Sequence, residues 1–423
     1  MLRKTIRILL LITALAACST EYENEYIESP DLGAEALHLV ELIEATHPIF
    51  IITPSLLPQN YQAIRAEFLD HASQTDCVTQ FAFAGQRFFT ALQDGHMAQR
   101  WLGNTGYFIY VDWDVRDDRL FLSEGAEITA IGGVPIPDVF AQVDRHYFSE
   151  NKFDRAINLT INSRDKEILR IAGAELADHH TTLTLLVDGE HSTKEVGFTH
   201  TNRWVFADVD FDQQYIIRYE WLDDIFYISL RQFTHHPTVY DVITAIREAA
   251  LNGTDKFIVD VRGNGGGNSM VGTMLLNAMG ITQPAWGTHR RYSDLAREQR
   301  PMMRSDTDSS ISIRSPWATN ANNVFVSVLT DNFSYSAATM FAATVQDGGL
   351  GNVVGEPSRN APTSFGDMLH YHLPVSGLDI FISYTKFFRP DVNADQNILW
   401  PDVMVPADAA LDAAVQFLNN LEV

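Results

Sequence analysis

One stretch, residues 324–366, constrains this chain more than any other. It opens with VFVSVL at residues 324–329, a β-branched and aromatic run of strand length with no helical period. After a turn, apolar residues recur at i, i+3, i+4 and i+7 and predict a half-buried helix that ends at Gly348-Gly349. The periodic residues are Ala338, Phe341, Ala342 and Val345. The stretch therefore predicts a strand, a turn and a helix in direct succession.

Two serines, Ser334 and Ser336, stand at this turn, and each admits two interpretations. A serine at a helix start is most often an N-cap. A hydroxyl at that place also lies beside unpaired backbone N–H groups that favour negative charge, which suits a nucleophile whose reaction forms an oxyanion. The stretch alone favours the cap, and the rest of the chain must decide.

From about Tyr215 onward the chain alternates strands and helices, the pattern of a mostly parallel sheet covered on both faces. One strand, residues 257–261 (FIVDV), runs into RGNGGGN at residues 262–268. Three consecutive glycines allow unusual torsions and a close approach of the backbone to a ligand. The spacing is not G-x-G-x-x-G, and no Gly-Lys-Ser/Thr follows, so a nucleotide site is disfavoured. The predicted fold class is α/β, mixed α+β overall.

Residues 31–93 carry three successive helical patterns and end in Leu92-Gln93-Asp94-Gly95-His96. The glycine is expected to stop the last helix and leave His96 on a loop. Such a histidine is usually solvated or a cap, but its ordinary pKa near 6.5 also suits a general base. His96 is therefore a candidate base.

Taken together, three blocks resemble the carboxy-terminal processing (tail-specific) serine peptidases, and more closely their tricorn-core-like branch. The blocks are residues 94–96 (DGH), residues 260–267 (DVRGNGGG), and residues 332–337 (NFSYSA) with Gln346-Asp347 and residues 354–357 (VGEP). The resemblance runs from about Asp31 to the end. It implies a ClpP/crotonase-like catalytic core with a helical N-terminal domain and an inserted PDZ-like domain.

The implied domain ranges are a signal peptide at 1–17, a tether at 18–30, a helical domain at 31–104, a PDZ-like domain at 105–200 and a peptidase core at 201–423. Residues 125–136 (GAEITAIGGVPI) resemble part of a PDZ domain, a kind of domain that binds extended peptide ends by adding a strand to a sheet edge. Residues 138–175 are longer and more helical than a minimal PDZ domain needs. A peptide-binding groove and a purely structural insert both remain open.

By this resemblance Ser336 is the nucleophile, and the N–H groups of Ala337 and Gly266 form the oxyanion hole. Lysine-using members carry their general base just after the Gly-Glu-Pro block, where this chain has Ala361, so that mechanism is excluded in its usual form. Tricorn-like members use a histidine instead, which is His96 here.

In the tricorn-like branch a serine before the histidine and a glutamate before a Pro-Asp pair complete a relay. This chain has Gly95 and Asp395 at those positions. The relay is therefore incomplete, and either Asp395 or Asp94 is expected to orient His96.

Two other residues near these blocks have open roles. Lys386 is a second candidate base, although an exposed lysine is the more common case. Asp347 is expected to cap or brace the helix that follows Ser336. No His-Glu-x-x-His or paired Cys-x-x-Cys spacing occurs, so we expect no metal and no cofactor.

The N-terminus has the pattern of an export signal. Basic residues precede an apolar run, residues 8–17, that is too short to span a bilayer, and the run ends Leu15-Ala16-Ala17-Cys18. This ending resembles a bacterial lipoprotein signal, in which Cys18 would be lipidated; an ordinary cleaved signal is the alternative. Ser19 lacks the aspartate of an inner-membrane retention signal, so the outer membrane, facing the periplasm or cell surface, is the expected location.

The formal net charge of −24 disfavours a nucleic-acid partner, because such a partner requires a basic stripe. The sequence thus predicts an exported, lipid-anchored serine endopeptidase that acts on a peptide or protein substrate. The alternative is a catalytically inactive lipoprotein of the same fold that binds a peptide or an apolar ligand.

Overall fold

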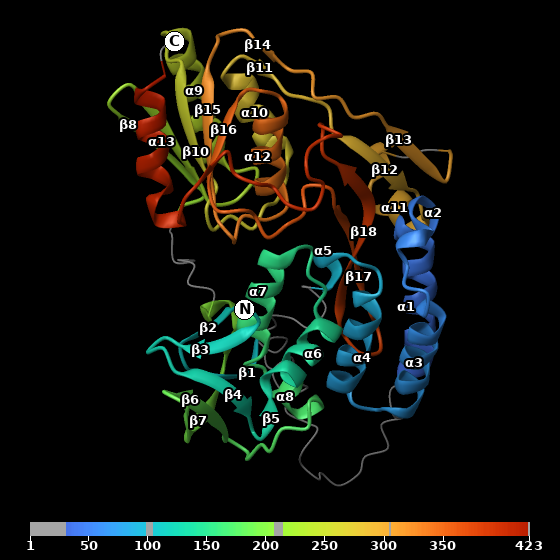
Figure 1. The fold of residues 1–423 in the computed structure, drawn as a ribbon. Coiled ribbons are helices and arrows are strands. Elements are labelled where there is room, and N and C mark those ends of the chain that lie inside the picture. Colours follow the sequence, from blue (N-terminus) through green and yellow to red (C-terminus); the bar gives the residue numbers. More distant parts are fainter. Residues whose placement is uncertain (1–30, 99–104, 207–214, 304–305, 422–423) are drawn as a thin grey trace, which may run out of the picture.

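The computed structural model describes residues 31–98, 105–206, 215–303 and 306–421. A six-stranded sheet forms the centre of the part of the chain that begins at residue 217 (Figure 1). Its order is β19 (Val403–Met404), β16 (Gly351–Gly355), β15 (Phe325–Thr330), β10 (Lys256–Asp260), β9 (Ile225–Leu230) and β8 (Ile217–Leu222). All neighbours are parallel except β8, which is antiparallel to β9. This arrangement confirms the predicted α/β class.

Helices cover both faces of this sheet, which explains why its strands are continuous apolar runs. All six residues of β9 are buried. One face packs against α9 (Pro237–Leu251), α10 (Met270–Ala278) and α12 (Ala337–Asp347). The other face packs against α13 (Ala410–Asn419), which lies on the opposite side in Figure 1. Short pieces flank this layer: β11 (Ile281–Thr282), β14 (Thr319–Asn320) and η4 (Ala407–Ala409).

The N-terminal helices form a layer beside a second, antiparallel sheet. The three predicted helical patterns are α1 (Leu32–Thr46), α3 (Tyr61–Gln74) and α4 (Val78–Thr90), with α2 (Ile49–Ile52) and η1 (Pro54–Leu56) between the first two. Asp31 caps α1 through a 2.9 Å bond from the Ala34 N–H. The chain then forms α5 (Gly95–Ala98), so His96 lies in a short helix and not on a loop.

The second sheet has the order β13 (Ser309–Ser312), β12 (Gly287–Arg291), β18 (Asp379–Phe388) and β17 (Phe365–His372), next to α11 (Asp294–Gln299) and η3 (Pro301–Met303). Its hairpin β17–β18 shares one apolar core with α1, α3 and α4. Leu39, Phe81, Leu369 and Ile382 are fully buried there. The helices are therefore held by residues more than 260 positions later in the chain.

Residues 105–206 form a third unit, in which an antiparallel sheet is covered by helices. The strand order is β1 (Thr105–Ile109), β7 (Glu190–Asn202), β6 (His180–Val187), β4 (Glu127–Ile131), β3 (Arg119–Leu122) and β2 (Trp113–Arg116), with β5 (Val134–Pro135) paired to β4. The helices are α6 (Ile136–His146), α7 (Lys152–Asn162) and α8 (Lys166–Ile171), followed by η2 (Arg203–Phe206). We call this unit the insert; its PDZ likeness and the domain limits stay predictions.

Candidate active site

The turn between β15 and α12 holds Ser336 in a conformation rare for a residue with a side chain. Its φ is 53° and its ψ is −118°. A positive φ at a non-glycine residue costs on the order of 1–3 kcal/mol and persists only where the surroundings enforce it. Although Ser336 is at the N-cap position of α12, its side chain makes no capping hydrogen bond. The cap interpretation therefore fails for Ser336, and its hydroxyl is left for another role.

Ser334, by contrast, is a structural residue of the turn. Its side chain is fully buried and donates to the Val261 carbonyl at 2.9 Å. Asp331 accepts the Ser334 N–H at 2.9 Å and the Gly263 N–H at 2.9 Å. Burial raises the pKa of Asp331, although these amide donors oppose the shift. Asp331 thus ties the glycine-rich loop after β10 to the turn after β15.

His96 lies against the Ser336 hydroxyl although 240 residues separate them. The distance from His96 Nε2 to Ser336 Oγ is 3.1 Å, a hydrogen-bond distance. His96 is 7% exposed, and its ring lies 4.9 Å from the ring of Tyr335, the residue before the nucleophile. This is the geometry required of a general base and a serine nucleophile.

Asp94 stands on the other side of the imidazole. Its Oδ1 accepts the His96 backbone N–H at 2.9 Å and lies 3.7 Å from Nδ1 of the same ring. Its Oδ2 lies 3.1 Å from Nε2 of the buried His47. Burial acts to raise the pKa of Asp94, but the His47 hydrogen bond and the nearby histidine charges outweigh it and hold the pKa below its ordinary value. A stable negative charge therefore lies beside the base.

A second carboxyl group, that of Glu150, comes from the insert and was missed by the sequence analysis. Its Oε1 lies 3.8 Å from His96 Nδ1 and 3.3 Å from the Tyr335 hydroxyl. Its Oε2 accepts the Ala361 N–H at 2.7 Å and the Asn360 side-chain amide. No local pattern marks this residue, because it stands in the short connection between two helices of a different unit.

Asp395 does not join this group, which corrects one of the two expectations for the residue that orients His96. Its carboxylate accepts the Asn397 N–H at 2.9 Å, the Ile398 N–H at 3.2 Å and the Trp400 indole N–H at 3.0 Å. These bonds within its own loop hold Asp395 in place. Asp94, the other expectation, does lie beside His96.

The oxyanion-hole prediction needs one correction. Ala337 is the first residue of α12, so its N–H has no acceptor within the helix. The N–H of Gly266, however, already donates to the Asn264 side chain at 2.8 Å. The next residue, Gly267, lines the cavity in front of Ser336. The structure thus makes Gly267, and not Gly266, the glycine of this loop that faces the cavity.

A cavity of about 810 Å³ opens in front of the Ser336–His96 pair. Its wall includes the glycine loop, the start of α12 and one face of the second sheet. Apolar side chains alternate there with polar ones, among them Trp286, Met340, Phe387, Arg290 and Arg300. The size suits an extended peptide segment, because ligand clefts commonly measure about 300–1,000 Å³.

Asp94, His96 and Glu150 also have the spacing of a metal site, since one ligand atom from each lies within 4.8 Å of the others. Asp94 Oδ1 and Glu150 Oε1 lie 3.7 and 3.8 Å from Nδ1 of His96, the candidate base. A cation there would displace the proton that Nδ1 must carry while Nε2 accepts from serine. We therefore interpret the cluster as part of a proton-transfer site.

Lys386, the second candidate base, is buried beside an aromatic ring. Lys386 is 8% exposed, which corrects the expectation of an exposed lysine, and its Nζ lies 4.6 Å from the Phe365 ring. Burial lowers the pKa of Lys386, and Asp94 opposes the shift.

Asp347 ends α12 and pairs with the buried Arg389, so it braces the helix as expected.

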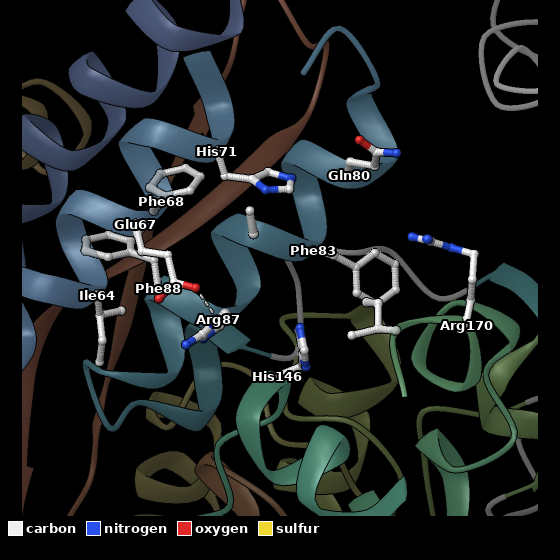
Figure 2. Close-up of a pocket in the computed structure, with 12 residues that line it drawn as sticks. Ile64, Glu67, Phe68, His71, Gln80, Phe83, Arg87, Phe88, His146 and Arg170 are labelled. Carbon is white, nitrogen blue, oxygen red and sulfur yellow. Dashed lines mark hydrogen bonds and ion pairs between the residues drawn. The ribbon is translucent and has the colours of Figure 1, made fainter. Parts of the chain in front are cut away.

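A second cavity, of about 350 Å³, lies between α3, α4 and the insert helices α6 and α8 (Figure 2). Phe68, Phe83 and Phe88 line it together with His146, and Arg87 pairs with Glu67 at its edge. Burial lowers the pKa of His146. Its lining residues include neither Ser336 nor His96, so this cavity is separate from the candidate active site.

Two solved structures of mature CPAF share this fold. Mature CPAF in complex with lactacystin aligns with a TM-score of 0.58 at 11% identity, covering 92% of this chain and 97% of that chain. Mature CPAF without a named ligand aligns with a TM-score of 0.56 at 11% identity, covering 92% of this chain and 95% of that chain. The photosystem II D1 C-terminal processing protease gives 0.46 at 12% identity over 92% and 97%.

The sequence comparison assigns the catalytic part. Residues 224–404 match the description peptidase family S41. The match includes both β10 with its glycine loop and the β15–α12 turn, but it excludes His96 and Glu150. In the described residues no helix is long and apolar enough to cross a bilayer. Residues 224–404 thus form a peptidase family S41 domain, and the chain is a serine-type peptidase.

Proposed function

We propose that the chain cleaves peptide bonds within peptides or proteins by acyl transfer at Ser336. The observation that carries this proposal is the 3.1 Å contact between His96 Nε2 and the hydroxyl of a serine held at φ 53°. The contact opens onto a cavity of peptide size. Asp94, whose pKa is held below its ordinary value, supplies the negative charge that balances the protonated imidazole.

In the first step His96 Nε2 takes the Ser336 proton while Oγ bonds to the scissile carbonyl carbon. The carbonyl oxygen becomes an oxyanion, and we assign its stabilisation to the N–H groups of Ala337 and Gly267, two residues that line the cavity. Nε2 then gives the proton to the leaving amine, the C–N bond breaks, and an acyl-enzyme remains. Water enters by the same route, losing a proton to Nε2 as it attacks, and Ser336 regains its proton when the product acid leaves.

A serine-directed fluorophosphonate tests this proposal. We expect one label on the peptide that contains Ser336, and Ser336→Ala should abolish it. Ser334→Ala is the matched control, because Ser334 lies two residues away but is buried and bonded to Val261. Labelling at another serine would contradict the assignment. If the wild type shows neither labelling nor hydrolysis of any peptide, the binding-protein alternative replaces it.

The lipid anchor is a further part of the proposal, and it rests on Leu15-Ala16-Ala17-Cys18, which lies outside the described residues. We expect the mature chain to be held at the bacterial cell envelope through Cys18, with Cys18→Ser released from membranes. The chain has two cysteines, Cys18 and Cys77, and a cysteine in a disulfide bond cannot be acylated. An acyl mass on the N-terminal peptide supports the anchor, whereas a Cys18–Cys77 disulfide or an unmodified, detergent-independent protein contradicts it.

A further inference from the structure

The connection between α6 and α7 brings the insert onto the loop that follows β16. The Asn151 side-chain amide donates to the carbonyls of Ser358 at 3.2 Å and Asn397 at 3.3 Å. Asp154 forms a 3.0 Å ion pair with Arg359, and both side chains are buried. These contacts lie one to four residues from Glu150. The insert is therefore docked on the catalytic part right beside the candidate active site.

Glu150 is connected to the nucleophile through Asn360. The Asn360 side-chain amide donates to Glu150 Oε2, and its side-chain oxygen accepts the Ser336 backbone N–H at 2.8 Å. Asn360 is 1% exposed, so water does not compete for these bonds. The second Glu150 donor, the Ala361 N–H at 2.7 Å, fixes the same loop. One carboxyl group thus positions the loop that holds the backbone of Ser336.

The other oxygen of Glu150 faces the base. Oε1 lies 3.8 Å from His96 Nδ1 and 3.3 Å from the Tyr335 hydroxyl, and Tyr335 in turn packs on the imidazole. Gly95 makes room for this arrangement. A Cβ at that position would lie 2.9 Å from Glu150 Oε1 and 2.7 Å from the Tyr335 hydroxyl. The glycine next to the base is thus explained by the two side chains that occupy the space beside it.

We propose that Glu150 is a positioning residue of the insert that fixes His96 relative to Ser336, so that the site is complete only while the insert is docked. This inference rests on the proposed function. It deepens that function by naming the element that regulates the site. Glu150 does not touch the reacting atoms; it acts through Asn360, Tyr335 and the Nδ1 side of His96.

The charges around Glu150 make the docking of the insert depend on pH. Burial raises the pKa of Glu150 to about 8, with further contributions from Asp154 and Asp94, while the bonds from Ala361 and Asn360 oppose the shift. His96 and Tyr335 also face the carboxyl group, and the Arg359 cation lies near through Asp154. Neutral Glu150 stabilises the docked insert. This stabilisation is complete at a pH below 4.5, the ordinary pKa of a glutamate, and is lost as the pH rises through the raised pKa of about 8. Docking should therefore weaken at alkaline pH.

Three variants test the inference by steady-state peptide hydrolysis. Glu150→Ala should lower kcat/KM about 100-fold, mostly through kcat, because a small misplacement of catalytic groups has an effect of that order. Glu150→Gln keeps the acceptor for Ala361 and should stay within about tenfold of the wild type at pH 7. Glu167→Gln is the control, since Glu167 belongs to the insert but pairs with Arg170 away from the site. It should not change the rate.

The pH profile separates positioning from a merely structural role. The wild type and Glu167→Gln should lose kcat/KM as the pH rises through about 8. Glu150→Gln should lack this decline, because its amide does not ionise. An unchanged decline in Glu150→Gln, or Glu150→Ala activity within threefold of the wild type, overturns the inference. If Glu150→Ala does not fold, the Glu150→Gln profile decides alone.

Fluorophosphonate labelling distinguishes this inference from the proposed function. A wild type that labels at Ser336 while Glu150→Ala labels at an equal rate defeats the inference alone. A wild type that does not label defeats the proposed function and this inference with it.

Discussion

The turn before α12 and the connection between α6 and α7 lie on either side of the Ser336–His96 pair, and the sequence specifies them in different ways. The turn follows a strand pattern and precedes a helical period, so its place in the fold is set by neighbouring residues. The connection is short and polar, and its Asn151 acts locally as the N-cap of α7. The preceding residue, Glu150, is joined to the candidate active site by hydrogen bonds from Asn360 and Ala361, more than 200 residues later in the chain.

The difference shows that this active site depends on contacts between units as much as on the peptidase domain itself. Residues 224–404 include Ser336, the proposed nucleophile, and the glycine loop. His96 comes from α5, outside that range, and Glu150 comes from the insert. A motion that separates these units would leave Ser336 in its turn without a base, as lid opening does in other enzymes.

The largest expected effect comes from removing the pair that joins the two units. Ser336→Ala and His96→Ala should each lower kcat/KM by about 10⁴-fold or more, and the double variant should be no worse, because the two residues act as one unit. Hydrolysis of a fluorogenic peptide at equal folded concentrations measures all three. Ser334→Ala should differ from the wild type mainly in stability. If the losses in kcat/KM were additive in the double variant, His96 and Ser336 would act independently, and the claim that the two units form one site would fail.

A smaller effect is expected from the glycine loop, on the side of the site that belongs to the peptidase domain. Gly266 has a φ of +97°, and a Cβ there would lie 2.7 Å from the Ser336 Cβ and 2.8 Å from the Ala337 nitrogen. Gly266→Ala should therefore displace the nucleophile and one oxyanion donor and reduce kcat by roughly 10²–10³-fold. Gly265→Ala is the matched control, because a Cβ there meets no atom within 4 Å. Equal activity of the two variants would contradict this account.

On the side of the site where Glu150 of the insert lies, Gly95→Ser should reduce kcat/KM by about 100-fold. The new Cβ would collide with Glu150 Oε1 and the Tyr335 hydroxyl and move His96. The same change in a Glu150→Ala background should have a smaller effect, since one of the two obstacles is gone. This double-mutant cycle sharpens the comparison, because full additivity would mean that Gly95 and Glu150 do not share space.

These cases show how far sequence reasoning reaches. The strand–turn–helix around Ser336 and the α/β class follow from periodicity and turn residues, which are local signals. The choice of Ser336 over Ser334 as the nucleophile depends on the family resemblance. His96 followed from its block only with the family resemblance. Asp395 was placed wrongly, because nothing local distinguishes a carboxylate that binds its own loop amides from one that reaches a histidine. The amide of Gly266 was assigned without the Asn264 side chain that occupies it.

The smallest expected effect concerns Lys386, the other candidate base. Lys386 is buried on β18, and its Nζ lies 4.6 Å from the Phe365 ring. Burial lowers its pKa, which is the environment that catalytic lysines use, so the residue needs a direct test. Lys386→Met keeps an unbranched side chain, one atom shorter, and removes the charge. If His96 is the base, the variant should retain activity within about threefold, and kcat/KM should still rise with pH as a histidine loses its proton. A loss as large as that of His96→Ala would instead assign proton transfer to Lys386, and the contact between α5 and the turn would then be structural.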